Sequence, residues 1–117
     1  MKSKMSELPV TAFESAEKLR AWLSLHHATS SGLWVKIFKK GSGVPSVTFS
    51  ELLDEGLCFG WSESMRRKGQ DGYYLQRFTP RKKIGSQSTR NQVRVERLIL
   101  EGRMTKAGLV ALGKESV

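Results

Sequence analysis

Cysteine is almost absent from this 117-residue chain, which contains Cys58 and no other. A single cysteine cannot form an internal disulfide, which is typical of proteins in a reducing compartment. Long apolar runs are missing too, since none approaches the roughly 20 residues that a membrane-spanning helix needs. The charged start at residues 1–7 is not followed by the apolar segment of a signal peptide. We therefore expect a cytoplasmic protein without a membrane span.

Motifs for metals and cofactors are also missing. The histidines His26 and His27 are neighbours, so they point to different sides of a helix and do not form a ligand set with Cys58. The glycine-serine loop at 41–43 lacks the Gly-Lys-Ser/Thr ending of a phosphate-binding loop. We expect no metal and no cofactor. A nucleophile made of Cys58 and a histidine is a catalytic alternative, but a cysteine between two large apolar neighbours usually behaves as a small buried residue.

Negative charge is scarce in the second half of the chain. The net charge is +9, and residues 61–117 contain thirteen Lys and Arg against five Asp and Glu. Clustered positive charge attracts polyanions such as nucleic acids through steering and counterion release. A solvated surface that only keeps the protein soluble is the alternative. The cations expected to bind an anionic partner are Arg66, Arg67, Lys68, Arg77, Arg81, Lys82, Lys83, Arg90 and Arg94, and Arg97 belongs to the same cluster.

Hydrophobic periodicity and capping residues predict the helices and strands. Apolar residues at helical spacing follow Ser15, and the capping box of Thr48 and Glu51 begins a second helix that Gly60 can end. Runs of β-branched and aromatic residues indicate strands. The predicted elements are a helix at 16–26, a strand at 33–39, a helix at 49–59, strands at 61–67 and 73–79, a helix at 89–101 and a short helix after Thr105.

This order, αβαββαα, predicts a small α+β domain. We expect a three-stranded, mostly antiparallel sheet with the helices packed on one face. A chain of this length supports one modest core. Residues 1–12 are predicted to form a flexible N-terminal arm, and residues 13–117 a single domain.

Aromatic residues and arginines alternate along the two strands of the predicted hairpin. Exposed rings can stack on bases while arginines hold phosphates, as in proteins that bind single strands. Strand alternation places Tyr74 and Phe78 on one face and Tyr73 and Arg77 on the other. Because the helices must cover one of the faces, at most half of these rings are available to a partner.

The Leu-Cys-Phe-Gly-Trp segment at 57–61 lies where helical periodicity gives way to strand alternation. We expect Trp61 to be buried at the start of its strand. Glu63 is either a general base or an ion-pair partner of Arg67 or Arg77. If the protein is instead an enzyme, we expect its active site in a cleft near Cys58, Trp61 and Glu63.

Several short motifs occur in order between about Phe13 and Leu112. They are Ala21-Trp22-Leu23, Gly32-Leu33-Trp34, Lys39-Lys40-Gly41-Ser42-Gly43, Cys58-Phe59-Gly60-Trp61, Phe78-Thr79-Pro80-Arg81 and Glu101-Gly102-Arg103-Met104. Together they resemble the YdeI/OmpD-associated family, which is linked to bacteriocin protection. The resemblance implies a bacterial protein with a role in tolerance of antimicrobial peptides, and it supplies no catalytic residues. The chain departs from the family pattern at Ser62-Glu63, where Ile-Asp is usual, and at Gln87-Ser88, where a Trp is common.

These features predict a non-enzymatic binding module of the YdeI/OmpD-associated type, which recognises nucleic acid or another polyanion through its basic surface. The alternative is a small enzyme or small-ligand-binding protein that uses the cleft near residues 58–63.

Overall fold

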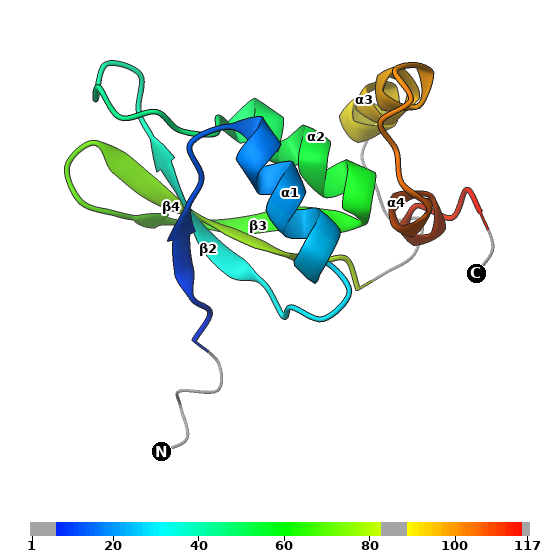
Figure 1. Ribbon diagram of the computed structural model, residues 1–117, viewed down its shortest axis with the longest axis horizontal. Coiled ribbons are helices and arrows are strands. Elements are labelled where there is room, and N and C mark those ends of the chain that lie inside the picture. Colours follow the sequence, from blue (N-terminus) through cyan, green and yellow to red (C-terminus); the bar gives the residue numbers. More distant parts are fainter. Residues whose placement is uncertain (1–6, 83–88, 116–117) are drawn as a thin grey trace.

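A computed structural model of the chain describes residues 7–82 and 89–115 (Figure 1). The elements, in chain order, are the strand β1 (Val10–Ala12), the helix α1 (Ala16–His26), β2 (Leu33–Phe38), α2 (Phe49–Phe59), β3 (Trp61–Lys68), β4 (Tyr73–Pro80), α3 (Thr89–Leu100) and α4 (Lys106–Ala111). The α+β class and all elements from α1 onward agree with the expectation from sequence. Lys83 and the departure at residues 87–88 lie outside the described residues.

The sheet contains four strands in the order β1-β2-β4-β3, so the predicted three-stranded sheet and the order αβαββαα are wrong. The additional strand, β1, runs parallel to β2 with Val10 opposite Trp34, and the other two pairings are antiparallel. β1 belongs to the segment that was predicted to be an arm. Three residues are too few to show strand alternation, and this strand forms because the edge of β2 offers it backbone partners.

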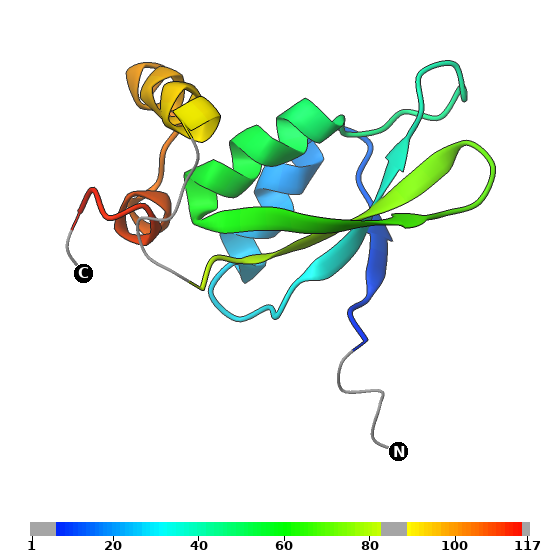
Figure 2. The ribbon, with the colours of Figure 1, turned by 180° about the vertical axis from the view of Figure 1, so that it is seen from behind.

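Helices α1 and α2 cover one face of the sheet, while α3 and α4 pack against α2 (Figure 1). Seen from behind, the strands lie in front of α1 and α2, and no described helix crosses the sheet on this side (Figure 2). None of the helices within the described residues has the length and apolar character needed to cross a membrane.

The hydrophobic core lies between the helices α1 and α2 and the sheet. It includes the buried side chains of Leu19, Leu23, Val35, Ile37, Leu52, Leu57, Trp61 and Phe78. The ring of Trp61 is 1% exposed, its centroid lies 5.0 Å from that of Phe78, and its indole N–H donates to the carbonyl oxygen of His27 at 3.3 Å. The predicted burial of Trp61 at the start of a strand is therefore confirmed.

The turn from α2 into β3 is the tightest connection in the chain and depends on a glycine. The predicted capping box begins α2: the hydroxyl of Thr48 accepts from the backbone N–H of Glu51, and the Glu51 carboxylate accepts from that of Thr48. At the other end Gly60 is left-handed, with φ of +80°. A Cβ atom at Gly60 would lie 2.8 Å from the Cβ of Ala111, so α4 packs directly on this turn.

We expect Trp61→Ala to lower the free energy of unfolding by about 3–5 kcal/mol, because the substitution deletes a large ring from a packed core. Met65 is a matched control on the same strand, since its side chain is 57% exposed. Met65→Ala should change stability by about 0.5 kcal/mol or less. Urea denaturation of the parent and both variants measures the difference, and similar stabilities for all three would contradict the placement of Trp61.

Candidate anion-binding face of the sheet

The arginines of α3 are occupied by the protein itself. Arg94 and Arg97 both donate to the Oδ1 atom of Asp54 on α2, at 2.7 and 2.8 Å. Arg97 also lies 3.4 Å from Glu101. The structure thus assigns these two predicted anion-binding residues to an intramolecular ion-pair cluster. The side chain of Arg90, like Lys83, lies outside what the structure describes.

A second buried carboxylate, Glu55, extends this cluster to α1 and to the segment before α4. Its Oε1 atom accepts from Arg20 at 2.9 Å, and its Oε2 atom accepts from Arg103 at 2.8 Å. Arg20 donates in addition to the backbone carbonyl of Arg103 at 2.8 Å. Asp54 and Glu55 were given no role in the prediction from sequence. Their signal would have been two adjacent acids in the apolar helix 49–59 of a chain rich in arginine.

A β-bulge between Glu63 and Arg66 reverses the alternation of β3 and so decides which face each of Arg66 and Arg67 takes. Arg66 lies on the helix side, with its Cζ atom 4.2 Å from the ring centroid of Tyr74. Arg67 lies on the other side, 4.2 Å from the ring centroid of Trp34. Bulges add one residue to a strand and so reverse the alternation beyond them.

The face of the sheet opposite the helices, which we call the open face, presents a run of cations and hydroxyl groups. Cross-strand partners point to the same side of a sheet. This face is therefore defined by two cross-strand pairs, Trp34 with Arg77 and Lys36 with Leu75. Arg67 lies on the same face because its guanidinium group packs over the ring of Trp34. The strand residues assigned to it are Val10, Ala12, Trp34, Lys36, Phe38, Ser62, Ser64, Arg67, Tyr73, Leu75, Arg77 and Thr79, and none of them is acidic.

Two aromatic rings lie at the end of the open face near the β3–β4 loop. Phe38 and Tyr73 are cross-strand partners with ring centroids 5.0 Å apart, and the Nζ atom of Lys36 lies 4.7 Å from the Tyr73 ring. Lys68, at the end of β3, is exposed but pairs with Tyr74 and therefore lies on the helix side. As predicted, Tyr73 and Arg77 share the open face, whereas Tyr74 and Phe78 pack on the helix side. Trp34 is 4% exposed, so its ring is not available for stacking.

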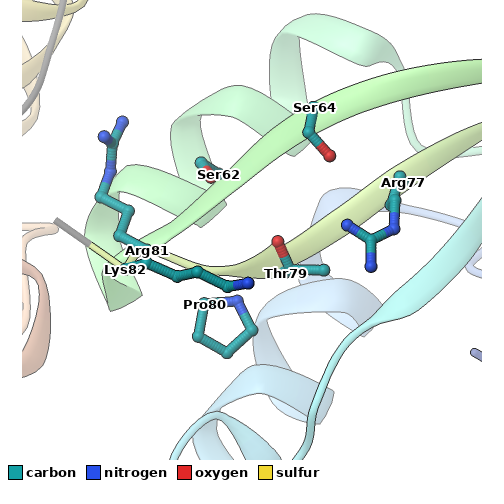
Figure 3. A pocket seen from close by; sticks show the side chains of 7 residues that line it. All are labelled: Ser62, Ser64, Arg77, Thr79, Pro80, Arg81 and Lys82. Carbon is teal, nitrogen blue, oxygen red and sulfur yellow. The ribbon is translucent and has the colours of Figure 1, made fainter. Parts of the chain in front are cut away.

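A shallow hollow of about 340 Å³ lies at the other end of the open face, where β3 begins and β4 ends (Figure 3). We call it the β3–β4 hollow. Its lining consists of Ser62, Ser64, Arg77, Thr79, Pro80, Arg81 and Lys82. The side chains of Lys82 and Arg77 approach Thr79 from two sides, whereas the guanidinium group of Arg81 points away from the hollow (Figure 3).

Arg81 belongs to the boundary between the hollow and the helix layer. Burial lowers the pKa of its guanidinium group, and the nearby charge of Glu63 acts in the opposite direction. Glu63 pairs with Phe78 and lies on the helix side of β3, away from Arg67 and Arg77. The described residues therefore include no ion pair of Glu63 with Arg67 or Arg77, which the sequence had suggested.

The residues proposed for a catalytic cleft are packed rather than open. Cys58 and Trp61 are 0% and 1% exposed. The space that Glu63 lines with Trp61 and Phe78 has no room for a water molecule. Burial raises the pKa of the Cys58 thiol, with Arg20 acting in the opposite direction, which favours the unreactive protonated form.

The two histidines also have structural surroundings. The His26 ring packs against Trp22 at a centroid distance of 5.0 Å. The His27 ring lies 5.2 Å from Phe59, and its Nδ1 atom is 2.8 Å from the carbonyl oxygen of Leu23. Within residues 7–82 and 89–115, no three His, Cys, Asp or Glu side chains are grouped so that they could hold a metal ion.

We expect Glu55→Ala to lower the free energy of unfolding by about 2–3 kcal/mol, because it leaves Arg20 and Arg103 without their shared buried partner. Glu96 on α3 is exposed and provides the control. Glu96→Ala removes the same charge from the surface and should change stability by about 0.5 kcal/mol or less. Thermal and urea unfolding distinguish the two, and equal effects would mean that the cluster contributes only through net charge.

Comparison with known proteins assigns the chain to a family. No curated protein and no solved structure matches it. One family model does match, over residues 11–111, and this span includes α1 to α4, most of β1 and every residue that lines the β3–β4 hollow. The chain belongs to the family described as Domain of unknown function (DUF8412).

Proposed function

We propose that this protein is a non-enzymatic cytoplasmic module that binds single-stranded nucleic acid over the open face of its sheet. The observation that carries the proposal is the charge of that face, since all the charged side chains that the strands present there are Lys or Arg. An acid-free array of cations attracts a phosphate backbone and releases its counterions.

The cations of the open face differ from those of α3 in what surrounds them. Arg94 and Arg97 share the single charge of Asp54, and Arg97 also pairs with Glu101, so much of their charge is already balanced within the protein. The described residues include no ion pair to Lys36, Arg67 or Arg77. Packing of Lys36 and Arg67 over aromatic rings orients the cations without cancelling their charge.

The ring pair of Phe38 and Tyr73 favours a single strand over a duplex. Both rings are half-buried and lie at one end of the row of cations. Bases of a single strand can stack on such rings while the phosphates follow the positive charge, and this arrangement needs no sequence preference. In a duplex, by contrast, the bases are already stacked on each other.

The alternative reading as an enzyme has less support. It relies on a cleft near Cys58, Trp61 and Glu63, and the described side chains fill that region. The hollow on the open face lies on the other side of β3 and contains hydroxyl groups and cations rather than a paired acid and base. These features favour binding over catalysis.

We expect a fluorescent single-stranded oligonucleotide to bind at about 20 mM salt, where screening is weak. Log affinity should fall with log salt concentration by about 0.7 per phosphate contact. The double variant Lys36→Ala with Arg77→Ala should weaken binding to all sequences and flatten the slope by about 1.4, since it removes two contacts.

The control variant Lys18→Ala with Lys106→Ala removes the same charge from exposed positions on α1 and α4. It should retain most of the affinity. An equal loss in both double variants would assign binding to net charge rather than to the open face. If the parent protein shows no binding even at low salt, the proposed function is wrong.

We also infer, from the resemblance to the YdeI/OmpD-associated family alone, that this binding serves tolerance of antimicrobial peptides. A bacterial strain without the protein should then survive exposure to a bacteriocin less well than its parent. The Lys36→Ala, Arg77→Ala variant should restore survival less than the control variant does. Survival counts after a bacteriocin challenge test this step, and equal survival of the parent and deletion strains would contradict it.

A further inference from the structure

We propose that the β3–β4 hollow binds the terminal phosphate monoester of a nucleic-acid strand and so anchors one end of that strand on the open face. This inference deepens the proposed function and rests on it. The hollow brings three hydroxyl groups and the cations Arg77 and Lys82 together at one end of the open face.

The hydroxyl groups come together because of the sheet register. Ser62 is the cross-strand partner of Thr79, so their side chains lie on the same face. Ser64, two residues farther along β3, also lines the hollow. The hydroxyls of Ser64 and Thr79 are directed toward the space between the two strands (Figure 3). Each hydroxyl can donate one hydrogen bond to a phosphate oxygen.

Two cations complete the donor set. Arg77 and Lys82 reach into the hollow from opposite sides, and neither forms an ion pair with another described residue (Figure 3). A guanidinium group binds phosphate in a planar, bidentate manner, and an ammonium group adds a compact charge. No acidic side chain lines the hollow, so nothing in its described lining repels an anion.

A terminal phosphate fits this donor set better than an internal one. A monoester carries nearly two negative charges at neutral pH and exposes three acceptor oxygens. An internal phosphodiester carries a single charge and exposes two oxygens that are not shared with sugars. The two cations balance the charge of a monoester, and its three terminal oxygens offer more acceptor sites to the hydroxyls and cations than the two free oxygens of a diester.

The position of the hollow suits an anchor. Tyr73 and Thr79 are six residues apart on β4, which corresponds to about 20 Å along an extended strand. A chain held by its end near Thr79 can therefore pass Arg77, Lys36 and Arg67 and reach the rings of Phe38 and Tyr73. The hollow and the ring pair thus define the two ends of one binding track.

The test compares one oligonucleotide sequence with a 5′-phosphate, with a 3′-phosphate and with hydroxyl groups at both ends, by fluorescence anisotropy. We expect at least one phosphorylated form to bind roughly tenfold more tightly than the hydroxyl form, as for one or two charge-assisted hydrogen bonds. The tighter form identifies the direction of the strand.

The preference should shrink when the pH falls from about 7.5 to 5, because the second ionisation of a monoester lies near pH 6. The hollow is lined by hydroxyls, Pro80 and the cations Arg77, Arg81 and Lys82. No histidine or carboxylate belongs to this described lining, so a decrease reports on the phosphate. A preference that persists unchanged at pH 5 would overturn the assignment to a monoester.

Variants separate the hollow from the rest of the open face. Ser64→Ala with Lys82→Gln should remove most of the preference for the phosphorylated end, and both residues are exposed, so the fold is retained. Lys36→Gln is the control, and it should weaken all oligonucleotides alike while leaving the preference intact. If Lys36→Gln instead removes the preference for the phosphorylated end, that preference belongs to the open face as a whole and not to the hollow.

The outcomes distinguish the two proposals. Equal binding of phosphorylated and hydroxyl oligonucleotides overturns the anchor but leaves the open face as a binding surface. No binding of any oligonucleotide overturns the proposed function itself. Tighter binding of a phosphoserine peptide than of the phosphorylated oligonucleotide would overturn the assignment to nucleic acid and assign the hollow to a phosphoprotein.

Discussion

The adjacent carboxylates Asp54 and Glu55 hold the helical half of this protein together. They are only 8% and 3% exposed, and a carboxylate so deeply buried is stable only with partners. Arginines from α1, from α3 and from the segment before α4 provide these partners. The cluster thereby fixes three helices to α2, and all of them remain on the same side of the molecule. The uncovered sheet face is a consequence of this arrangement.

The same cluster also determines which of the many cations can contact a partner. A net charge of +9 suggests a broadly basic surface, but four of the arginines are held by carboxylates within the fold. Arg20, Arg94, Arg97 and Arg103 act as structural cations. Among the other cations, strand alternation and cross-strand register arrange Lys36, Arg67 and Arg77 in a row on the open face. A charge count therefore indicates an anionic partner more reliably than it identifies the residues that bind it.

The β3–β4 hollow shows why a site can be invisible in a sequence whose elements are predicted well. Arg77, Arg81 and Lys82 were predicted as binding residues from their charge, whereas no binding role was predicted for the hydroxyls of Ser62, Ser64 and Thr79. Serine and threonine are common on strands, and nothing local connects residue 62 to residue 79. The connection exists only in the register of β3 against β4. Conversely, Trp61 was identified correctly as a core residue because its apolar neighbours and Gly60 are signals within a few positions of it.

The amino-acid sequence by itself determined the helices α1 to α4, the strands β2 to β4 and the glycine turn at residue 60, because caps, periodicity and φ preferences act over a few residues. Only the tertiary structure decided three other features. β1 exists because β2 presents a free edge, and Asp54 and Glu55 are buried because arginines from distant segments reach them. The bulge after Glu63 directs Arg67 rather than Arg66 to the open face. Each of these depends on contacts between residues far apart in the chain, and such contacts leave no periodic or local pattern in the sequence.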